Sequence, residues 1–200
     1  LENLEKRRVI LYYENIVNLC NSIANHLLIC TNLRRKEDFF NTLRLFRELP
    51  EKFPEAKFRS VRLRIFQNSY SRELNWYNSV GEFDTATKIL PDIEAGLMEF
   101  KNELIPRLEK IIHFNLVQAF FGNGDHVRCL FWVNRMINDP RVEVWADLGV
   151  YVRLINLIVH FELGNHDLVE YAVKSTYRYL LKKKHLFGFE QILMRFFRTS

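Results

Sequence analysis

Histidine, cysteine and acidic residues are the side chains of this sequence that could bind a metal or carry out acid-base chemistry. His126 and His166 could form a metal pair, but they occupy equivalent turn positions 40 residues apart, where a packing ring is expected. His160 and His166 lie six residues apart across one of these turns. We therefore expect these histidines to pack between helices rather than to bind a metal.

Other catalytic signatures do not occur in the sequence. It has no Gly-rich phosphate loop, no paired His on adjacent helical turns with a glutamate, no nucleophile elbow and no Cys-x-x-Cys. Asp and Glu are spread along the chain, and no spacing forces two of them together. The sequence thus predicts no catalytic residue, no metal and no cofactor.

The three cysteines form an odd set. Cys20 and Cys30 are ten residues apart, roughly 15 Å along a single helix, so they cannot pair with each other there. Together with Cys129 they indicate buried, reduced thiols that pack. This usage favours a reducing compartment, and we expect a cytoplasmic location.

Two stripes of amides are the most informative polar feature. One follows residues 68–78 and the other residues 15–25, both at intervals of three and four that place each stripe on one helical face: Asn68, Ser71, Asn75 and Asn78, then Asn15, Asn18, Ser22 and Asn25. Asn is a poor helix former, so an uncharged stripe needs a reason. In one explanation the stripes are hydrogen-bonding faces between helices. In the other they line a concave surface, where Asn side chains hold the backbone of an extended peptide.

Clusters of basic residues offer an alternative partner. They are Lys57, Arg59, Arg62 and Arg64, then Arg34-Arg35-Lys36, and Lys182-Lys183-Lys184. Such clusters could contact nucleic-acid phosphates. They also suit solvated helix faces, and the lysine triplet suits a helix C-terminus, where cations complement the helix dipole.

Composition indicates long helices. The 200 residues are 48% hydrophobic and 26% charged, and the formal net charge is +5. Only seven Gly and five Pro are present to make turns. The most apolar stretch, residues 148–161, contains Arg153 and Asn156, so no membrane-spanning helix is expected. Because the sequence starts with Leu1, we expect a fragment of a longer protein.

Apolar spacing and turn residues predict helices throughout and no strands, hence an all-α fold. The expected helices cover residues 9–29, 36–49, 55–80, a segment from 83 that Pro91 kinks or divides, 106–122, 126–137, 140–163, 166–183 and 187–198. Pro50 is expected to end the second helix, Asp125 to cap the sixth, and Asp139-Pro140 to cap and open the seventh.

The turns repeat along the chain. A glycine, an acidic or amide residue and a ring recur at separations of 43 and 40 residues in Gly81-Glu82-Phe83, Gly124-Asp125-His126 and Gly164-Asn165-His166. A degenerate turn is expected at Glu37-Asp38-Phe39. Because a single helical hairpin cannot bury its apolar face alone, stacked neighbours must supply the core.

This pattern resembles the tetratricopeptide-repeat family, most closely from Phe114 to Phe120 and through Asp125 to Pro140. The resemblance covers about residues 65–181, although the family's period is about 34 residues. It implies one α-solenoid-like domain over residues 1–200, an array of about eight or nine helices in hairpins. The expected units are residues 9–53, 55–104, 105–139 and 140–184, with a capping helix at 186–198.

In that family the first helices of the hairpins line an inner groove. The resemblance implies that Gln118, Phe121 and Tyr151 continue the surface of the amide stripes, with Ile111, Phe114, Leu154, Ile158 and Phe161 beside them. The apolar tail from Leu186 to Phe197 could cap the array or dock on another chain. We therefore expect a non-enzymatic scaffold that recognises a peptide or partner helix, with a basic nucleic-acid-binding scaffold as the alternative.

The double substitution Asn75→Arg with Asn78→Arg separates the two explanations of the amide stripe. If the stripe is a groove, partner capture is abolished while circular dichroism and thermal melting stay unchanged. Unchanged capture would contradict the groove hypothesis, and a collapse of stability would favour the interhelical face.

Overall fold

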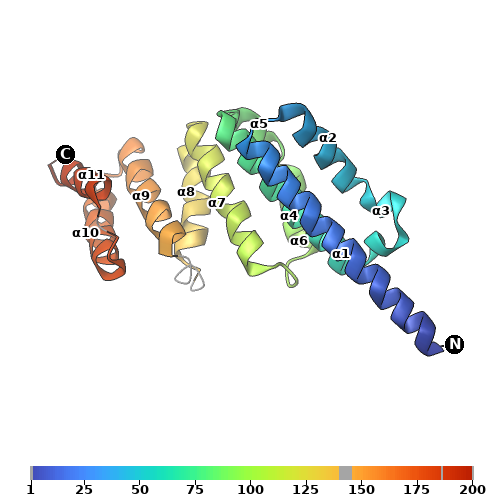
Figure 1. Ribbon diagram of the computed structural model, residues 1–200. Coiled ribbons are helices and arrows are strands. Elements are labelled where there is room, and N and C mark those ends of the chain that lie inside the picture. Colours follow the sequence, from blue (N-terminus) through green and yellow to red (C-terminus); the bar gives the residue numbers. More distant parts are fainter. Residues whose placement is uncertain (1, 140–145, 186, 200) are drawn as a thin grey trace. The chain divides into compact units, whose positions relative to one another are not determined.

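Helices are the only regular elements in the part of the chain that the computed structural model describes, residues 2–139, 146–185 and 187–199 (Figure 1). They confirm the all-α prediction. The elements are α1 (Glu2–Asn32), α2 (Lys36–Arg47), α3 (Leu49–Lys52), a 3₁₀ helix η1 (Pro54–Lys57), α4 (Arg59–Val80), α5 (Phe83–Lys88), α6 (Leu90–Glu99), α7 (Pro106–Gly122), α8 (His126–Ile137), α9 (Ala146–Glu162), α10 (His166–Lys183) and α11 (Gly188–Thr199).

Most expected boundaries agree with these bounds, including the break expected at Pro91, whereas the position of Pro50 differs from the expectation. Pro91 divides the expected fourth helix into α5 and α6, because it lacks an amide donor and its ring clashes with the preceding turn. Pro50 does not simply end α2, which stops at Arg47; Pro50 instead lies in the first turn of α3, where its missing donor costs nothing.

Three further helix ends compare differently with the expectation: one was not foreseen, one agrees, and one lies outside the described residues. The expected helix over residues 55–80 is interrupted at Phe58, whose φ of −55° and ψ of 135° separate η1 from α4. Asp125 caps α8 as expected, since its Oδ1 accepts a hydrogen bond of 3.0 Å from the Arg128 amide. The opening of the seventh helix at Pro140 lies outside the described residues.

One type of turn recurs. Gly81, Gly124 and Gly164 have φ values of +77°, +72° and +69°, a left-handed conformation that glycine adopts without steric cost. In each case the next residue donates its amide to a carbonyl five residues back, as in Glu82 to Tyr77 at 2.9 Å. The glycine amide donates a second hydrogen bond, as in Gly81 to the Asn78 carbonyl at 3.3 Å. The two hydrogen bonds satisfy carbonyls at the end of the helix that would otherwise lack partners.

The degenerate turn lies elsewhere than expected. The prediction placed it at Glu37-Asp38-Phe39, which is wrong, because these residues lie inside α2. Arg34 instead takes the left-handed conformation, with φ of 56°, and the Arg35 amide bonds to the Cys30 carbonyl at 2.9 Å. Sequence reasoning missed this turn because a non-glycine residue occupies its left-handed position.

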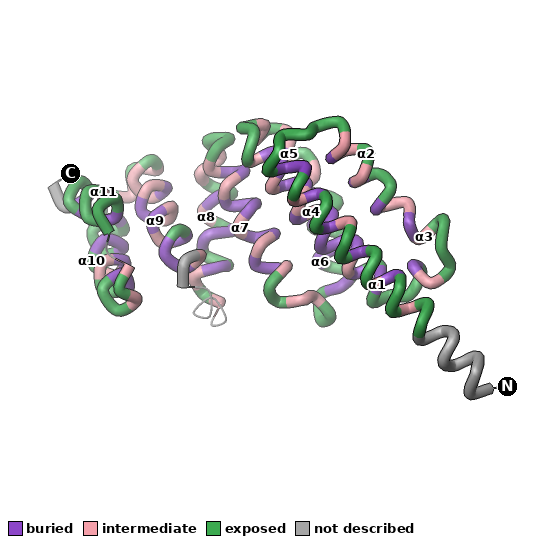
Figure 2. The backbone as a smooth tube through the Cα atoms, viewed as in Figure 1, coloured by how far each residue is buried: buried purple, intermediate pink, exposed green. Residues whose placement is uncertain are grey.

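The chain divides into two compact units, residues 1–112 and residues 113–200. The single domain with its four hairpin units stays a prediction. In residues 1–112, α1 packs against α2 and α4. From residue 11 onward, exposed and buried positions recur along α1 (Figure 2), and Cys20 and Leu27 are fully buried.

Aromatic rings fill the core of residues 1–112. The Phe39 ring stacks on Trp76 with centroids 4.6 Å apart, and Phe40 meets the same indole edge-on at 5.8 Å. Near them the Arg47 guanidinium bonds to the buried Glu73 carboxylate at 2.6 Å and lies 4.1 Å from the Tyr70 ring centre. These contacts hold α2 on α4.

In residues 113–200, α9 packs against α8 and α10, and α10 packs against α11. Their apolar faces form one core cluster: Val150, Leu154, Leu157, Val169, Ala172, Val173, Tyr179, Leu180, Met194 and Phe197. Since the last two come from α11, this terminal helix is part of the core. No described helix is both long and apolar enough to cross a membrane.

Replacing Gly96 by alanine tests the packing of α6 on α4. A Cβ at Gly96 would overlap the buried Phe66 ring, so Gly96→Ala should lower the free energy of unfolding in urea by about 1 to 3 kcal/mol. Gly188→Ala is the matched control, because a Cβ there meets no atom within 4 Å. Equal stability of the two variants would contradict the packing.

Candidate interaction surface

The two amide stripes differ in their surroundings. On α1 the stripe faces solvent, since Asn15, Asn18, Ser22 and Asn25 are all exposed. Ile16, Cys20 and Leu27 lie on the buried side of the same helix. The α1 stripe is therefore available for contact with a partner.

On α4 the stripe is largely covered. Asn68 is 8% exposed and donates from Nδ2 to the Arg64 carbonyl at 2.9 Å, and Ser71 is 2% exposed and donates to the Asn68 carbonyl at 3.1 Å. Asn75 and Asn78 are half-buried. The first two side chains thus bond to their own helix.

Two hydrogen bonds near the ends of the α4 amide stripe indicate which elements lie beside this row of residues. Ser60, eight residues before Asn68, contacts the Tyr13 hydroxyl of α1 at 3.0 Å. Ser79, beside Asn78, accepts from the Arg34 guanidinium at 2.9 Å. The row therefore lies toward α1 and the turn that follows it, which favours the interhelical explanation; a peptide-binding role for Asn75 and Asn78 stays a prediction.

Gln118, Phe121 and Tyr151, which were predicted to continue the groove, belong to the second unit. Gln118 and Phe121 on α7 are half-buried, and the Phe121 ring stacks on His126 with centroids 6.4 Å apart. Tyr151 on α9 is 52% exposed. The amide stripes belong to residues 1–112 and these three residues to residues 113–200, so each set is described within its own unit.

The basic cluster at the start of α4 is engaged within the protein through Arg59 and Arg62. Arg59 donates to Glu103 Oε1 at 2.7 Å, and Arg62 donates to Glu99 Oε1 at 2.8 Å. Both guanidinium groups also lie within 6.0 Å of the Phe100 ring centre. These bonds join the start of α4 to the end of α6, which gives the cluster a structural role.

The second cluster is engaged in the same way. Arg35 pairs with Asp38 at 2.5 Å, and Lys36 pairs with Glu82 at 3.2 Å. Such neutralised cations have less charge to offer to phosphates.

Burial shifts the pKa values of thiols and of one imidazole in the described part of the chain. All three cysteines are buried and free, and burial raises the pKa of Cys129 to about 12, so its thiol stays protonated. Burial lowers the pKa of His160, whose Nδ1 lies 3.3 Å from the Asn165 amide. Among the described residues no group of three potential ligands could hold a metal ion.

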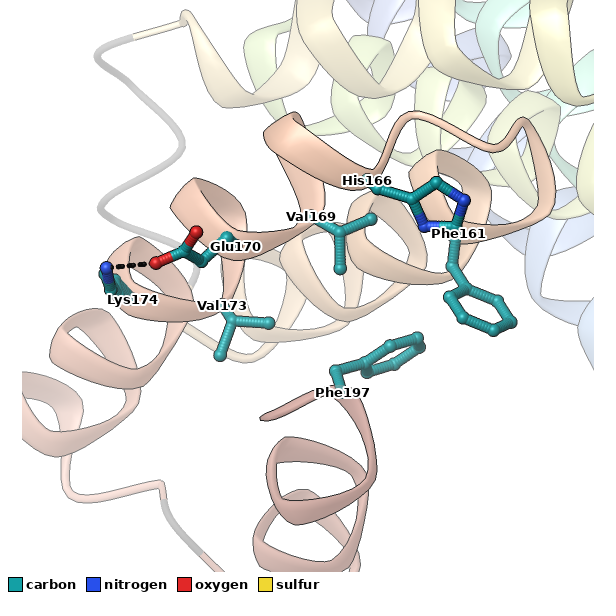
Figure 3. Close-up of a pocket in the computed structure, with 7 residues that line it drawn as sticks. All are labelled: Phe161, His166, Val169, Glu170, Val173, Lys174 and Phe197. Atoms are coloured by element: carbon teal, nitrogen blue, oxygen red, sulfur yellow. Dashed lines mark hydrogen bonds and ion pairs between the residues drawn. The ribbon is translucent and has the colours of Figure 1, made fainter. Parts of the chain in front are cut away.

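A cavity of about 630 Å³ opens in the second unit between α9, α10 and α11. We call it the α9–α11 groove, and its lining residues are Phe161, His166, Val169, Glu170, Val173, Lys174 and Phe197. Figure 3 shows the two phenyl rings at one end, the two valines between, and the charged side chains at the other end. Phe161, Val169, Val173 and Phe197 join the groove to the apolar core of this unit.

Polar groups border this apolar floor on α10. Lys174 pairs with Glu170 at 2.5 Å, and their side chains are 67% and 74% exposed. Residues 166, 170 and 174 follow at intervals of four, which places them along one side of the helix. The groove therefore combines an apolar floor with a charged edge, as binding sites for amphipathic segments do.

Apolar surface continues from the groove onto α11. The Phe161 ring contacts both Phe196 and Phe197, with centroids 5.8 and 5.4 Å apart. Phe189, Ile192 and Phe196 form a line on one face of α11, which we call the α11 stripe, and they are 62%, 70% and 52% exposed. Sequence reasoning identified this tail as apolar but placed no cavity beside it, because the cavity depends on how three helices meet.

Comparisons with protein-family models, with curated proteins and with solved structures find no match for this chain. The function must therefore be inferred from its own surfaces.

Adjacent phenylalanines on α11 provide a test of its place in the core. Phe197 is 7% exposed and belongs to the core cluster, so Phe197→Ala should lower the free energy of unfolding by about 3 to 5 kcal/mol. Phe196→Ala, at the 52% exposed neighbour, should cost far less. Chemical denaturation measures both, and equal losses would contradict the docking of α11.

Proposed function

We propose that this chain is a non-enzymatic interaction module that holds an apolar segment of a partner protein, most favourably a helix, in the α9–α11 groove. The observation that carries the proposal is the opening of the core between α9, α10 and α11, continued by the exposed α11 stripe. Contiguous exposed apolar surface of this kind marks interaction sites.

The size of the groove suits a side chain of a peptide. Ligand sites commonly occupy about 300 to 1,000 Å³, and the volume of about 630 Å³ lies within that range. Burying one large apolar side chain contributes about 1.5 to 3 kcal/mol. The α11 stripe extends the contact beyond one side chain, which favours a helix with anchors on successive turns.

Features of the fold support the wider interpretation as a helical-repeat scaffold. The same left-handed turn follows α1, α4, α7, α9 and α10, at Arg34, Gly81, Gly124, Gly164 and Lys184. A repeated helix end is what the proposed tetratricopeptide-like array of hairpins needs. The array would fix the groove on rigid elements before a partner arrives.

Nucleic-acid binding is the weaker candidate. The ion pairs of Arg59, Arg62 and Lys36 use charge that phosphate contacts would require. The affinity of a protein for nucleic-acid phosphates falls steeply as the salt concentration rises. Binding of a DNA or RNA duplex with that salt dependence would favour this alternative.

Selection from a random-peptide display library tests the module. Peptides are selected for binding to the whole chain. Their affinity for the Val169→Phe variant should be at least about tenfold weaker, or about 1.4 kcal/mol, because the phenyl ring takes up space in the groove that Val169 lines. Val127→Phe is the matched control, since Val127 is 71% exposed on α8 and does not line the groove.

Circular dichroism checks that each variant folds. If Val169→Phe is unstable, Ile192→Ser with Phe196→Ser replaces it, because both residues are exposed. Failure to enrich any peptide, or peptides that bind every variant equally, would overturn the proposed function.

A further inference from the structure

Positive charge is concentrated in residues 166–200, the segment that supplies α10 and α11 to the α9–α11 groove. Residues 166–200 contain seven Lys and Arg against three Asp and Glu, a net +4 out of the +5 of the whole chain. The remaining 165 residues are therefore almost neutral. The excess of cations over carboxylates in this segment, which forms α10 and α11, favours an acidic partner there.

The cations on α10 follow its exposed side. Lys174 lines the groove, and Arg178 and Lys182 continue from it at intervals of four residues. All three are exposed. The Arg178 Nε donates to the Lys174 carbonyl at 3.2 Å, which fixes the guanidinium along the helix.

Acidic neighbours offset only part of this charge. Glu170 pairs with Lys174, while Glu190 is buried at 7% exposure. Among the described residues Arg178 and Lys182 form no ion pair. This contrasts with the start of α4, where Glu99 and Glu103 balance Arg59 and Arg62.

We propose that the partner segment is an acidic amphipathic helix, with bulky apolar side chains in the α9–α11 groove and on the α11 stripe, and with Asp or Glu facing Lys174, Arg178 and Lys182. This inference rests on the proposed function and specifies its partner. Apolar anchors supply affinity, whereas charge complementarity supplies orientation and discrimination against basic partners.

A concave site favours a protein segment over a lipid surface. Basic and aromatic residues also attract anionic membranes, but a bilayer contacts protruding side chains and does not fill a cavity between three helices. Phe161, Val169 and Val173 lie in such a cavity. Occupation of the groove therefore separates the two classes of partner.

Twin synthetic peptides test the inference. Both carry Leu and Phe anchors at positions i, i+3, i+4 and i+7 of a helix; one has Glu at the remaining positions and the other has Lys. Fluorescence anisotropy with the whole chain should show the acidic twin binding roughly tenfold more tightly at low salt, since several exposed charge contacts contribute together. The difference should shrink as salt screens these contacts.

Matched variants assign the effect to the groove. Lys174→Glu with Arg178→Glu should abolish the preference for the acidic twin, and Val169→Phe should weaken the acidic twin at every salt concentration. Lys88→Glu with Lys101→Glu is the control, because it changes the net charge equally at exposed positions in the first unit. It should leave the preference intact.

The outcomes distinguish the inference from the proposed function. Equal binding of the twins, with both lost in Val169→Phe, would overturn the acidic partner and leave the interaction module standing. If neither twin binds while the peptide library yields groove-dependent binders, the inference alone is overturned. Sedimentation with phosphatidylcholine–phosphatidylserine vesicles tests lipid binding. If the Val169→Phe variant still sediments with the vesicles but the Lys174→Glu, Arg178→Glu variant does not, the basic side of α10 binds lipid and the inference is overturned.

Discussion

An amphipathic helix is stable only where neighbours cover its apolar face, and in the second unit this requirement falls on α11. The helix buries Met194 and Phe197 in the core cluster with α9 and α10, yet it leaves Phe189 and Ile192 in solvent. One helix thus completes the core and at the same time forms the edge of an open groove. The proposed binding role depends on that incomplete closure, because a groove filled by side chains of its own unit would have no room for a partner.

Arginines of residues 1–112 and two exposed cations of α10 differ in whether they have a carboxylate partner. In residues 1–112, arginines join helices through carboxylates, as Arg47 does with Glu73 and Arg62 does with Glu99. In α10 the exposed cations Arg178 and Lys182 form no such pairs among the described residues. Exposed ion pairs contribute little to stability, so the difference matters less for folding than for what each surface attracts. A basic edge beside an apolar floor favours segments that carry both acidic and apolar side chains.

Local chemistry made much of the fold predictable from sequence. Gly81, Gly124 and Gly164 end helices because glycine tolerates a left-handed backbone, Asp125 caps α8, and Pro91 divides a helix. The turn at Arg34 and the break at Phe58 were missed, since neither has a comparable local signal. Spacing placed Asn68 and Ser71 on one face of α4 but could not reveal that α1 lies toward that face. The α9–α11 groove was missed for the same reason: its lining comes from residues up to 36 positions apart, which only packing brings together.

Hydrogen–deuterium exchange of the whole chain, with and without a bound groove-dependent peptide, is the most direct test of the claim that α9, α10 and α11 form the binding site. The account predicts that added protection is confined to the end of α9, the first half of α10 and α11, with α1 and α4 unchanged. Protection of the amide stripe on α1, without protection of α10 and α11, would contradict it and would return the site to the first unit.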